Sequence, residues 1–439
     1  MRGAAGRRGR AGAIVQPAVM STGMTARLPA YWRNVMTVLG GALGAQALPL
    51  LAAPLITRLC TPADVGAFSV WLGLVAVAAI GATLRLEAAI ILDHERAAQR
   101  TCFSVVAWSA TLTALLMTAG AAGARLSGLP FAAQLSWPAL LTLGLATWMT
   151  AYMQTILAYA TSHNAFGKAA RARVWSAGSI AAAQVGLLAL GMGGVALIAG
   201  QLAGLALGLL AAIVLLAPPQ AWPGWRLDQA QRAYLRRHDK FWRFSLPSNL
   251  LNVMVGQLPL LLIGARHGAL AAGLFALTQR VLGAPIALLA ASVLEVFKRQ
   301  SVHDFQTQGN CRDAYRTTFK ALVLLGIGPS LVLLLFSPHL FAFAFGEHWR
   351  PAGELAQLLA PLYFLNFIAS PLSYVFFVAG KQKIDLVWQV ALFAMTLAVF
   401  LAPGTLRQSV LWYATGYSLL YLVYLRMSYQ CAQNRMVAA

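Results

Sequence analysis

The stretch VALIAGQLAGLALGLLAAIVLLA, residues 195–217, runs for 23 positions without a charged side chain. A helix needs about 20 mainly apolar residues to cross the hydrocarbon core of a bilayer, so this stretch predicts a membrane-spanning helix. The whole chain of 439 residues has the same character, with 59% hydrophobic and only 10% charged residues. A soluble chain averages about 25% charged residues. The composition therefore excludes an ordinary soluble enzyme, a disordered chain and a fibrous repeat.

Similar apolar stretches lie on both sides of this one and predict an all-α polytopic membrane protein with twelve transmembrane helices. They occupy residues 35–57, 68–92, 101–123, 137–160, 174–193, 195–217, 244–264, 269–296, 321–341, 355–379, 385–402 and 408–427. Only Gly193 and Gly194 mark the boundary between the fifth and sixth stretches.

The formal net charge of +21 is compatible with nucleic-acid binding or with the basic cytoplasmic loops of a membrane protein. With the N-terminus inside, 26 of the 33 Lys and Arg residues fall in inner segments and five in outer loops. The remaining two, Arg85 and Arg280, fall within spans. This asymmetry follows the positive-inside rule. It predicts that both termini are cytoplasmic, and it explains the charge without a nucleic-acid partner.

The chain also repeats itself across its middle. Four features of the first half recur in the same order in the second: Tyr31-Trp-Arg33 as Phe241-Trp-Arg243, Gln46-Ala-Leu-Pro49 as Gln257-Leu-Pro259, Arg58 as Arg266, and Gly66-Ala-Phe68 as Gly273-Leu-Phe275. Because each half holds an even number of spans, both halves insert with the same orientation. The repeat therefore predicts two pseudo-symmetric six-helix bundles around a central cavity, related by an axis along the membrane normal.

This repeat divides the chain into four expected segments. They are a disordered tail (1–30), an N-terminal bundle (31–217), a cytoplasmic amphipathic linker (218–243) and a C-terminal bundle (244–439). In the linker, Leu227, Ala230, Tyr234 and Phe241 recur at helical spacing among arginines. That pattern is typical of a helix on the inner leaflet, with its basic groups toward anionic head groups. A solvated linker helix is the alternative.

Ionisable groups inside spans cost about 3 kcal/mol or more at mid-depth, so each is a candidate functional residue. Arg280 is the foremost, because it lies about 17 Å along its helix from the outer end and is too deep to snorkel easily. We expect it to line the cavity and to hold an anionic group. Arg85 and Glu87 lie in the inner third of the second span, where they either line the inner vestibule or reach the head groups. Being two positions apart, they are expected to face different sides of their helix.

Several uncharged polar side chains also fall within spans, where they could bind a sugar or join helices to one another. They are Gln46, Asn249, Asn252, Gln257, Gln279 and Asn366. The sequence contains no H-E-x-x-H, G-x-x-x-x-G-K-[ST], G-x-S-x-G or C-x-x-C motif. We therefore expect no catalytic residue, no metal and no cofactor. Any active transport would draw on an H⁺ or Na⁺ gradient or on the gradient of the substrate itself.

Two segments of the first half resemble the opening of bacterial oligosaccharide flippases, which act in lipopolysaccharide and exopolysaccharide synthesis. PLITRLCTPADVGAF, residues 54–68, is similar to the turn after their first span, with Cys60 and Val65 in place of the usual aromatic residues. LRLEAAII, residues 84–91, carries their arginine–glutamate element at Arg85 and Glu87.

The second half resembles the same family. FGEHWRPAG, residues 345–353, is similar to the family's F-G-x-x-W-x-x-A-G turn, and Ser370-Pro-Leu-Ser373 and Gly380-Lys-Gln-Lys383 are similar to its next landmarks. The resemblance covers about residues 30–430. It implies a non-enzymatic, MATE-like transporter of the multidrug/oligosaccharidyl-lipid/polysaccharide exporter superfamily. The implied activity moves an undecaprenyl-diphosphate-linked oligosaccharide, for O-antigen or exopolysaccharide, across the bacterial inner membrane. The implied partners are that substrate, membrane lipids, and a polysaccharide polymerase and chain-length regulator.

Three other functions compete with this one. An ion-coupled multidrug antiporter of the same fold would bind cations, which favours a buried carboxylate over Arg280. A lipid II flippase typically has fourteen spans rather than twelve. A membrane glycosyltransferase, polymerase or ligase, which belongs to a different class, tends to need a large outer loop with catalytic residues, whereas the predicted outer loops are short.

Overall fold

The chain is helical in the part described by the computed structural model, which comprises residues 30–93, 95–129, 132, 135–219 and 227–433. The first half contains α1 (Ala30–Leu59), α2 (Pro62–Thr83), α3 (Leu86–Ala89), α4 (Arg96–Leu126), α6 (Trp137–Ser162), α7 (Phe166–Ala189) and α8 (Val195–Leu216). The tail expected at residues 1–30 lies, apart from Ala30, outside the described residues.

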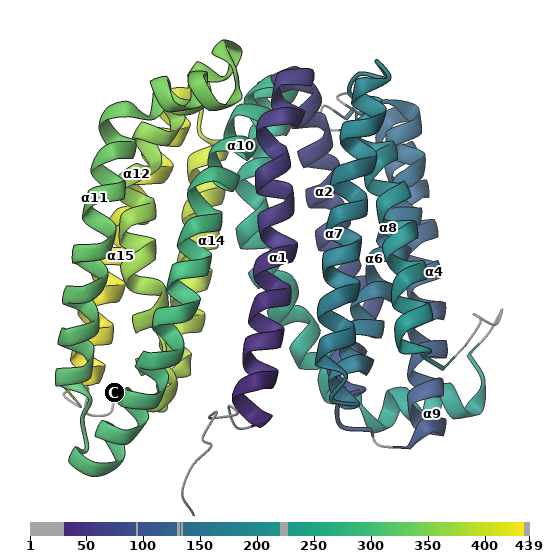
Figure 1. The fold of residues 1–439 in the computed structure, drawn as a ribbon, viewed down its shortest axis with the longest axis horizontal. Helices are drawn as coiled ribbons and strands as arrows, with labels where there is room; N and C mark the ends of the chain where they lie inside the picture. Colours follow the sequence, from purple (N-terminus) through teal and green to yellow (C-terminus); the bar gives the residue numbers. More distant parts are fainter. Residues whose placement is uncertain (1–29, 94, 130–131, 133–134, 220–226, 434–439) are drawn as a thin grey trace, which may run out of the picture.

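The linker and the second half continue the helical pattern. They contain α9 (Gln229–Arg237), a π-helical turn η1 (Phe241–Ser245), α10 (Leu246–Gln308), α11 (Arg312–Phe345), a 3₁₀ turn η2 (Glu347–Trp349), α12 (Arg350–Leu372), α13 (Val375–Val378), α14 (Gln382–Leu401) and α15 (Leu406–Ala432). Figure 1 shows α2, α4, α6, α7 and α8 on one side, α11, α12 and α15 on the other, and α1 and α10 between them.

The exposed surface of these helices is apolar. Among the described residues, eight helical segments are long and apolar enough to cross a membrane. On α11, for example, the side chains of Leu324, Leu335 and Phe343 are 78%, 61% and 82% exposed. An apolar surface of this extent is not stable in water and needs lipid around it. The chain is therefore a multi-pass membrane protein.

A helix covers most of each of the twelve predicted stretches, but four of them are interrupted or merged in the structure. The second ends early, at Thr83, because Leu84 and Arg85 adopt left-handed backbone angles (φ 51° and 60°). The seventh and eighth both lie in α10, which is interrupted at Gly268 (φ 87°), where only glycine avoids steric strain. The tenth ends at Leu372 and resumes as α13. Twelve membrane crossings stay a prediction.

Helices α2 and α10 cross at two glycines that correspond in the sequence repeat. A Cβ atom at Gly66 would overlap the carbonyl oxygen of Ala269, and one at Gly273 would overlap that of Pro62. Gly66 and Gly273 are 207 positions apart, and so are Pro62 and Ala269. The two contacts are therefore one reciprocal contact, as at a two-fold interface. Equivalent positions of the two repeats therefore contact one another.

A pair of hydrogen bonds follows the same repeat. The indole Nε1 of Trp71 donates to the carbonyl oxygen of Ala139 at 2.9 Å, and Thr278 Oγ1 donates to that of Ala352 at 2.8 Å. Trp71 and Thr278 are again 207 positions apart. Ala139 and Ala352 are the third residues of α6 and α12. The two halves thus join their second and fourth predicted apolar stretches in the same way.

Two of the segments that carry the family resemblance, residues 54–68 and 345–353, contact one another. Near the end of α1, where the last carbonyl groups lack a helical donor, the oxygen of Thr57 accepts a hydrogen bond from Trp349 Nε1 at 3.0 Å. His348 Nε2 lies 3.1 Å from the same oxygen. The guanidinium of Arg58 in turn donates to the carbonyl oxygen of Phe343 at 3.0 Å. These contacts join α1 to the turn between α11 and α12.

The linker helix α9 packs on the end of α4. Its N-cap residue Asp228 forms a capping box with Gln231, and the amide of Gln231 also contacts Ser104. The buried hydroxyl of Tyr234 donates to Asp93 at 2.6 Å, and burial raises the pKa of this phenol. The arginines of α9 at positions 232, 236 and 237 are exposed. The amphipathic helix is therefore shorter than the predicted linker, and its buried face lies against protein.

Candidate functional site

A cavity of about 510 Å³ opens among α1, α2, α6, α7 and α8, and α10 contributes to its wall. Its polar lining consists of Gln46, Arg173, Ser176, Gln184, Gln201 and Arg280. Apolar side chains such as Phe68, Leu72 and Met153 line the rest. The sequence predicted a cavity shared between the two halves. That central cavity stays a prediction. The cavity described here lies mostly in the first half, because Arg280 and Ala284 are its only lining residues from the second half among those described.

One face of α7 supplies much of the polar lining. Arg173, Ser176 and Gln184 are spaced three and eight positions apart, so they fall on the same side of the helix. Ser176 and Gln184 also pack against α8, next to Gly208 and Gly200 respectively. Gly204 and Gly208 make that packing possible, because a Cβ atom at either position would overlap α7. These small residues therefore let α8 approach α7 closely.

The cavity is positively charged. Arg173 and Arg280 both line it, and neither guanidinium has a hydrogen-bond or ion-pair partner among the described residues. All twelve Asp and Glu residues of the chain belong to the described part, and none of them lines the cavity. Two unpaired guanidiniums in a partly apolar hollow form an environment that favours an anion.

Arg280 lines a cavity of the first half because α10, the helix that carries it, packs against α2. It lies 207 positions after Gly73, so the two residues correspond in the repeat. Gly73 faces Gln257, since a Cβ atom would lie 3.1 Å from the Oε1 atom of Gln257. Gln257 in turn corresponds to Gln46, which lines the cavity with Arg280. The repeat therefore has two equivalent positions for a charge, and only the one facing the first half carries arginine.

The arginine–glutamate element lies elsewhere. Arg85 and Glu87 do not line the cavity but form an ion pair with an N–O distance of 2.8 Å. The expectation that they face different sides of one helix is wrong, because the helix is broken at Leu84 and Arg85 by their left-handed backbone angles. The break lets the two side chains turn toward one another.

Of the uncharged polar residues singled out in the sequence, Gln46 lines the cavity, whereas Gln257, Asn252 and Gln279 do not. Gln257 faces Gly73, Asn252 is exposed, and Gln279 is half-buried beside Arg280 in the sequence. Sequence reasoning missed Arg173, which it assigned to a loop because the predicted span began at 174. In the structure α7 begins eight positions before that point, at Phe166. The helical spacing of Arg173 with Ser176 and Gln184 was the signal that could have found it.

Comparison with known proteins identifies the family. Residues 55–354 match the profile of a family described as "Polysaccharide biosynthesis protein". The chain belongs to this family. A relative, the teichuronic acid biosynthesis protein TuaB of Bacillus subtilis (strain 168), is 23% identical over 169 residues. That match covers 38% of the chain and 35% of TuaB, so the chain spans about a third of this relative's length. The predicted family resemblance is confirmed.

Solved structures of the multidrug and polysaccharide exporter superfamily share the fold of this polysaccharide biosynthesis protein. An inward-facing MATE family transporter aligns with a TM-score of 0.58 and 14% identity, over 92% of this chain and 96% of the other. A MATE transporter in complex with MaD5 gives 0.55 and 17% identity, over 91% and 95%. A superfamily transporter from Pyrococcus furiosus, described as having a binding pocket of reversed polarity, gives 0.54 and 14%, over 92% and 97%. The fold of this chain is therefore MATE-like.

Proposed function

We propose that this protein is a flippase that moves an undecaprenyl-diphosphate-linked oligosaccharide from the inner to the outer leaflet of the bacterial inner membrane. The observation that carries the proposal is the cavity lined by Arg173 and Arg280 without a carboxylate. A diphosphate cannot cross hydrocarbon unaided, and guanidinium groups recognise phosphate oxygens through paired N–H donors. The polyprenyl tail would stay in lipid while the head group crosses through the cavity by alternating access.

On this proposal the twelve long helical stretches all cross the membrane, as two pseudo-symmetric six-helix bundles with both termini cytoplasmic. The reciprocal contact between Gly66 and Gly273 supports such a pair of bundles. Gln46 and Gln201 are available to hydrogen-bond the sugars next to the diphosphate, whereas Gln184 already donates to the carbonyl oxygen of Leu197 at 3.0 Å. Coupling to an H⁺ or Na⁺ gradient, and docking to a polysaccharide polymerase and chain-length regulator, belong to the same proposal.

The cavity gives less support to a multidrug antiporter. A carrier of cationic drugs needs negative charge where the cargo binds, whereas the lining residues of this cavity carry positive charge only. The Pyrococcus furiosus neighbour is described as having a pocket of reversed polarity that suggests a different function, so this fold is not restricted to one polarity of pocket.

Two assays test the activity directly. The gene should restore surface glycan in a bacterial strain that lacks its own oligosaccharide flippase. The purified protein in vesicles should also move a fluorescent oligosaccharide diphosphate lipid between leaflets, but leave fluorescent phosphatidylcholine in place. Failure of both assays, or equal movement of the two lipids, would contradict the proposed function.

The orientation can be tested by cysteine labelling. Ala230 on α9 is exposed, and the four native cysteines are all buried and so are expected to react slowly. Ala230→Cys should react with a membrane-impermeant maleimide only after the cells are permeabilised. The exposed Ser127, at the far end of α4, provides the matched control, because Ser127→Cys should react in intact cells. The reverse pattern would overturn the predicted topology.

A further inference from the structure

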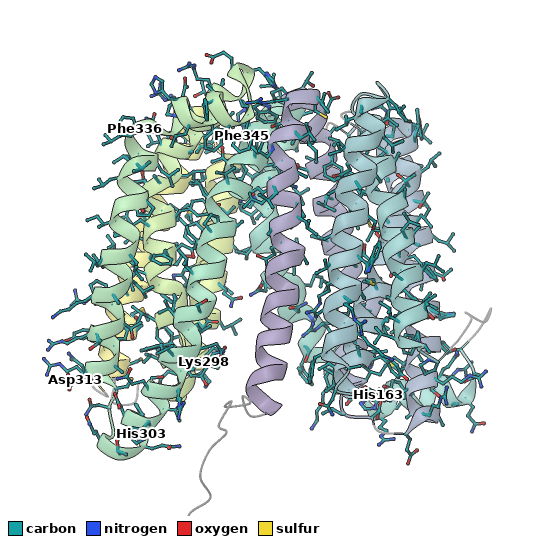
Figure 2. The ribbon with its side chains drawn as sticks, viewed as in Figure 1. His163, Lys298, His303, Asp313, Phe336 and Phe345 are labelled. Carbon is teal, nitrogen blue, oxygen red and sulfur yellow. The ribbon has the colours of Figure 1, made fainter. Side chains whose placement is uncertain are left out.

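A second cavity, of about 560 Å³, lies between the first turns of α11 and the last turns of α15. Three cations line it, Arg316 and Lys320 from α11 and Arg426 from α15. Figure 2 shows Asp313, on the same part of α11, at the end of the molecule that also holds Lys298, His303 and His163. The cavity is separate from the candidate functional site, since the two have no lining residue in common.

The cations are combined with aromatic and apolar side chains. The guanidinium of Arg316 lies 5.7 Å from the centre of the Tyr429 ring, and its Nε donates to the Tyr429 hydroxyl at 2.9 Å. Phe319 and Leu425 supply apolar wall beside Lys320. Tyr429 thereby orients Arg316, while the N–H groups of Arg316 other than Nε have no bond to protein among the described residues.

The charged side chains that line this cavity are all positive. Arg316, Lys320 and Arg426 are all exposed, and no carboxylate lines the cavity in the described part of the chain. Asp313 lies three positions before Arg316, is exposed and is not part of the lining. An amphiphile with a phosphate group matches both parts of this lining, because its head group would meet the cations and its chains would meet the apolar wall.

We propose that this cavity binds an anionic phospholipid from the leaflet at the end of the protein where Arg316, Lys320 and Arg426 lie. Clusters of Lys and Arg between helices at the membrane surface bind anionic head groups, and aromatic residues favour the same depth. Arg316 and Arg426 bind phosphate oxygens, Lys320 adds charge, and Phe319 and Leu425 contact the acyl chains. The site is independent of the proposed transport function, since it shares no residue with the cavity of Arg280.

Native mass spectrometry of the purified full chain tests the site with cardiolipin, phosphatidylglycerol and phosphatidylcholine as probes. The wild type should retain cardiolipin and phosphatidylglycerol more tightly than phosphatidylcholine. The triple variant Arg316→Gln, Lys320→Gln and Arg426→Gln should bind cardiolipin on the order of tenfold more weakly. Lys320→Gln alone should give a smaller loss in the same direction, and it changes one exposed side chain only, so it tests the site even if the triple variant is poorly folded.

A matched control separates this site from the net charge of the protein. Arg100, Lys168 and Arg171 are exposed cations of the first half, and their replacement by Gln removes the same charge. This control should keep its cardiolipin affinity within about twofold, because surface charges outside a built site act weakly and are screened. Equal loss in both triple variants, undiminished cardiolipin binding in the pocket variants, or equally tight phosphatidylcholine binding would overturn the proposal. None of these outcomes bears on the flippase assays.

Discussion

Arg280→Ala is expected to abolish glycan export while the protein still inserts in the membrane at the wild-type level. Hydrogen bonds to a charged group contribute about 1.5–3 kcal/mol, so loss of the guanidinium should weaken binding of the diphosphate roughly 10- to 100-fold. The fold should tolerate the change, because Arg280 has no ion-pair or hydrogen-bond partner among the described residues. Export in the complementation strain and the amount of membrane-inserted protein are the two measurements.

Three further variants show whether the effect is chemical. Arg280→Lys should retain part of the export, because lysine keeps the charge but loses the two-pronged donor geometry of arginine. Arg173→Gln should lower export less than Arg280→Ala does, because glutamine keeps a hydrogen-bond donor at position 173 whereas alanine leaves none at position 280. Arg407→Ala removes an arginine that is exposed at the start of α15, and it should export normally. Normal export by Arg280→Ala would show that this residue does not hold the diphosphate.

Gly273→Ala is expected to prevent correct folding, although it adds a single methyl group. The new Cβ atom would overlap the carbonyl oxygen of Pro62 and lie 2.9 Å from the backbone nitrogen of Gly66. Over-packing typically costs about 1–3 kcal/mol, and the cost here should exceed that range because both neighbours are backbone atoms that cannot turn away. The yield of monodisperse protein after detergent extraction, and its melting temperature, should both fall sharply. Gly66→Ala should behave in the same way.

Gly81→Ala is the control for this experiment. Gly81 lies on α2 as Gly66 does, but a Cβ atom there would have no neighbour within 4 Å. Alanine is favoured over glycine by about 1 kcal/mol within a helix, so this variant should be as stable as the wild type or slightly more stable. If Gly273→Ala has the same yield and melting temperature as Gly81→Ala, the helices do not cross as closely as the structure indicates.

Several properties of this protein could be read from its sequence because they depend on local composition. Residues 195–217, for example, carry a single polar side chain, that of Gln201, and are long enough to span a bilayer. They are therefore expected to form an apolar helix whatever the packing of the other helices. The family resemblance rests on short segments such as residues 54–68, which can also be recognised without knowledge of the fold. The correspondence of Gly66 with Gly273 was also visible, although the contact between them was not.

The residues that share a cavity were decided by the tertiary structure alone. Arg280 lines the same cavity as Gln46 because α10 crosses α2 at Gly66 and Gly273, which are 207 positions apart in the chain. Arg85 was equally prominent in the sequence, yet a left-handed turn pairs it with Glu87. Hydropathy and helical period describe each helix by itself. The direction in which a charged side chain points depends on how the helices cross, and that is set by packing between distant parts of the chain.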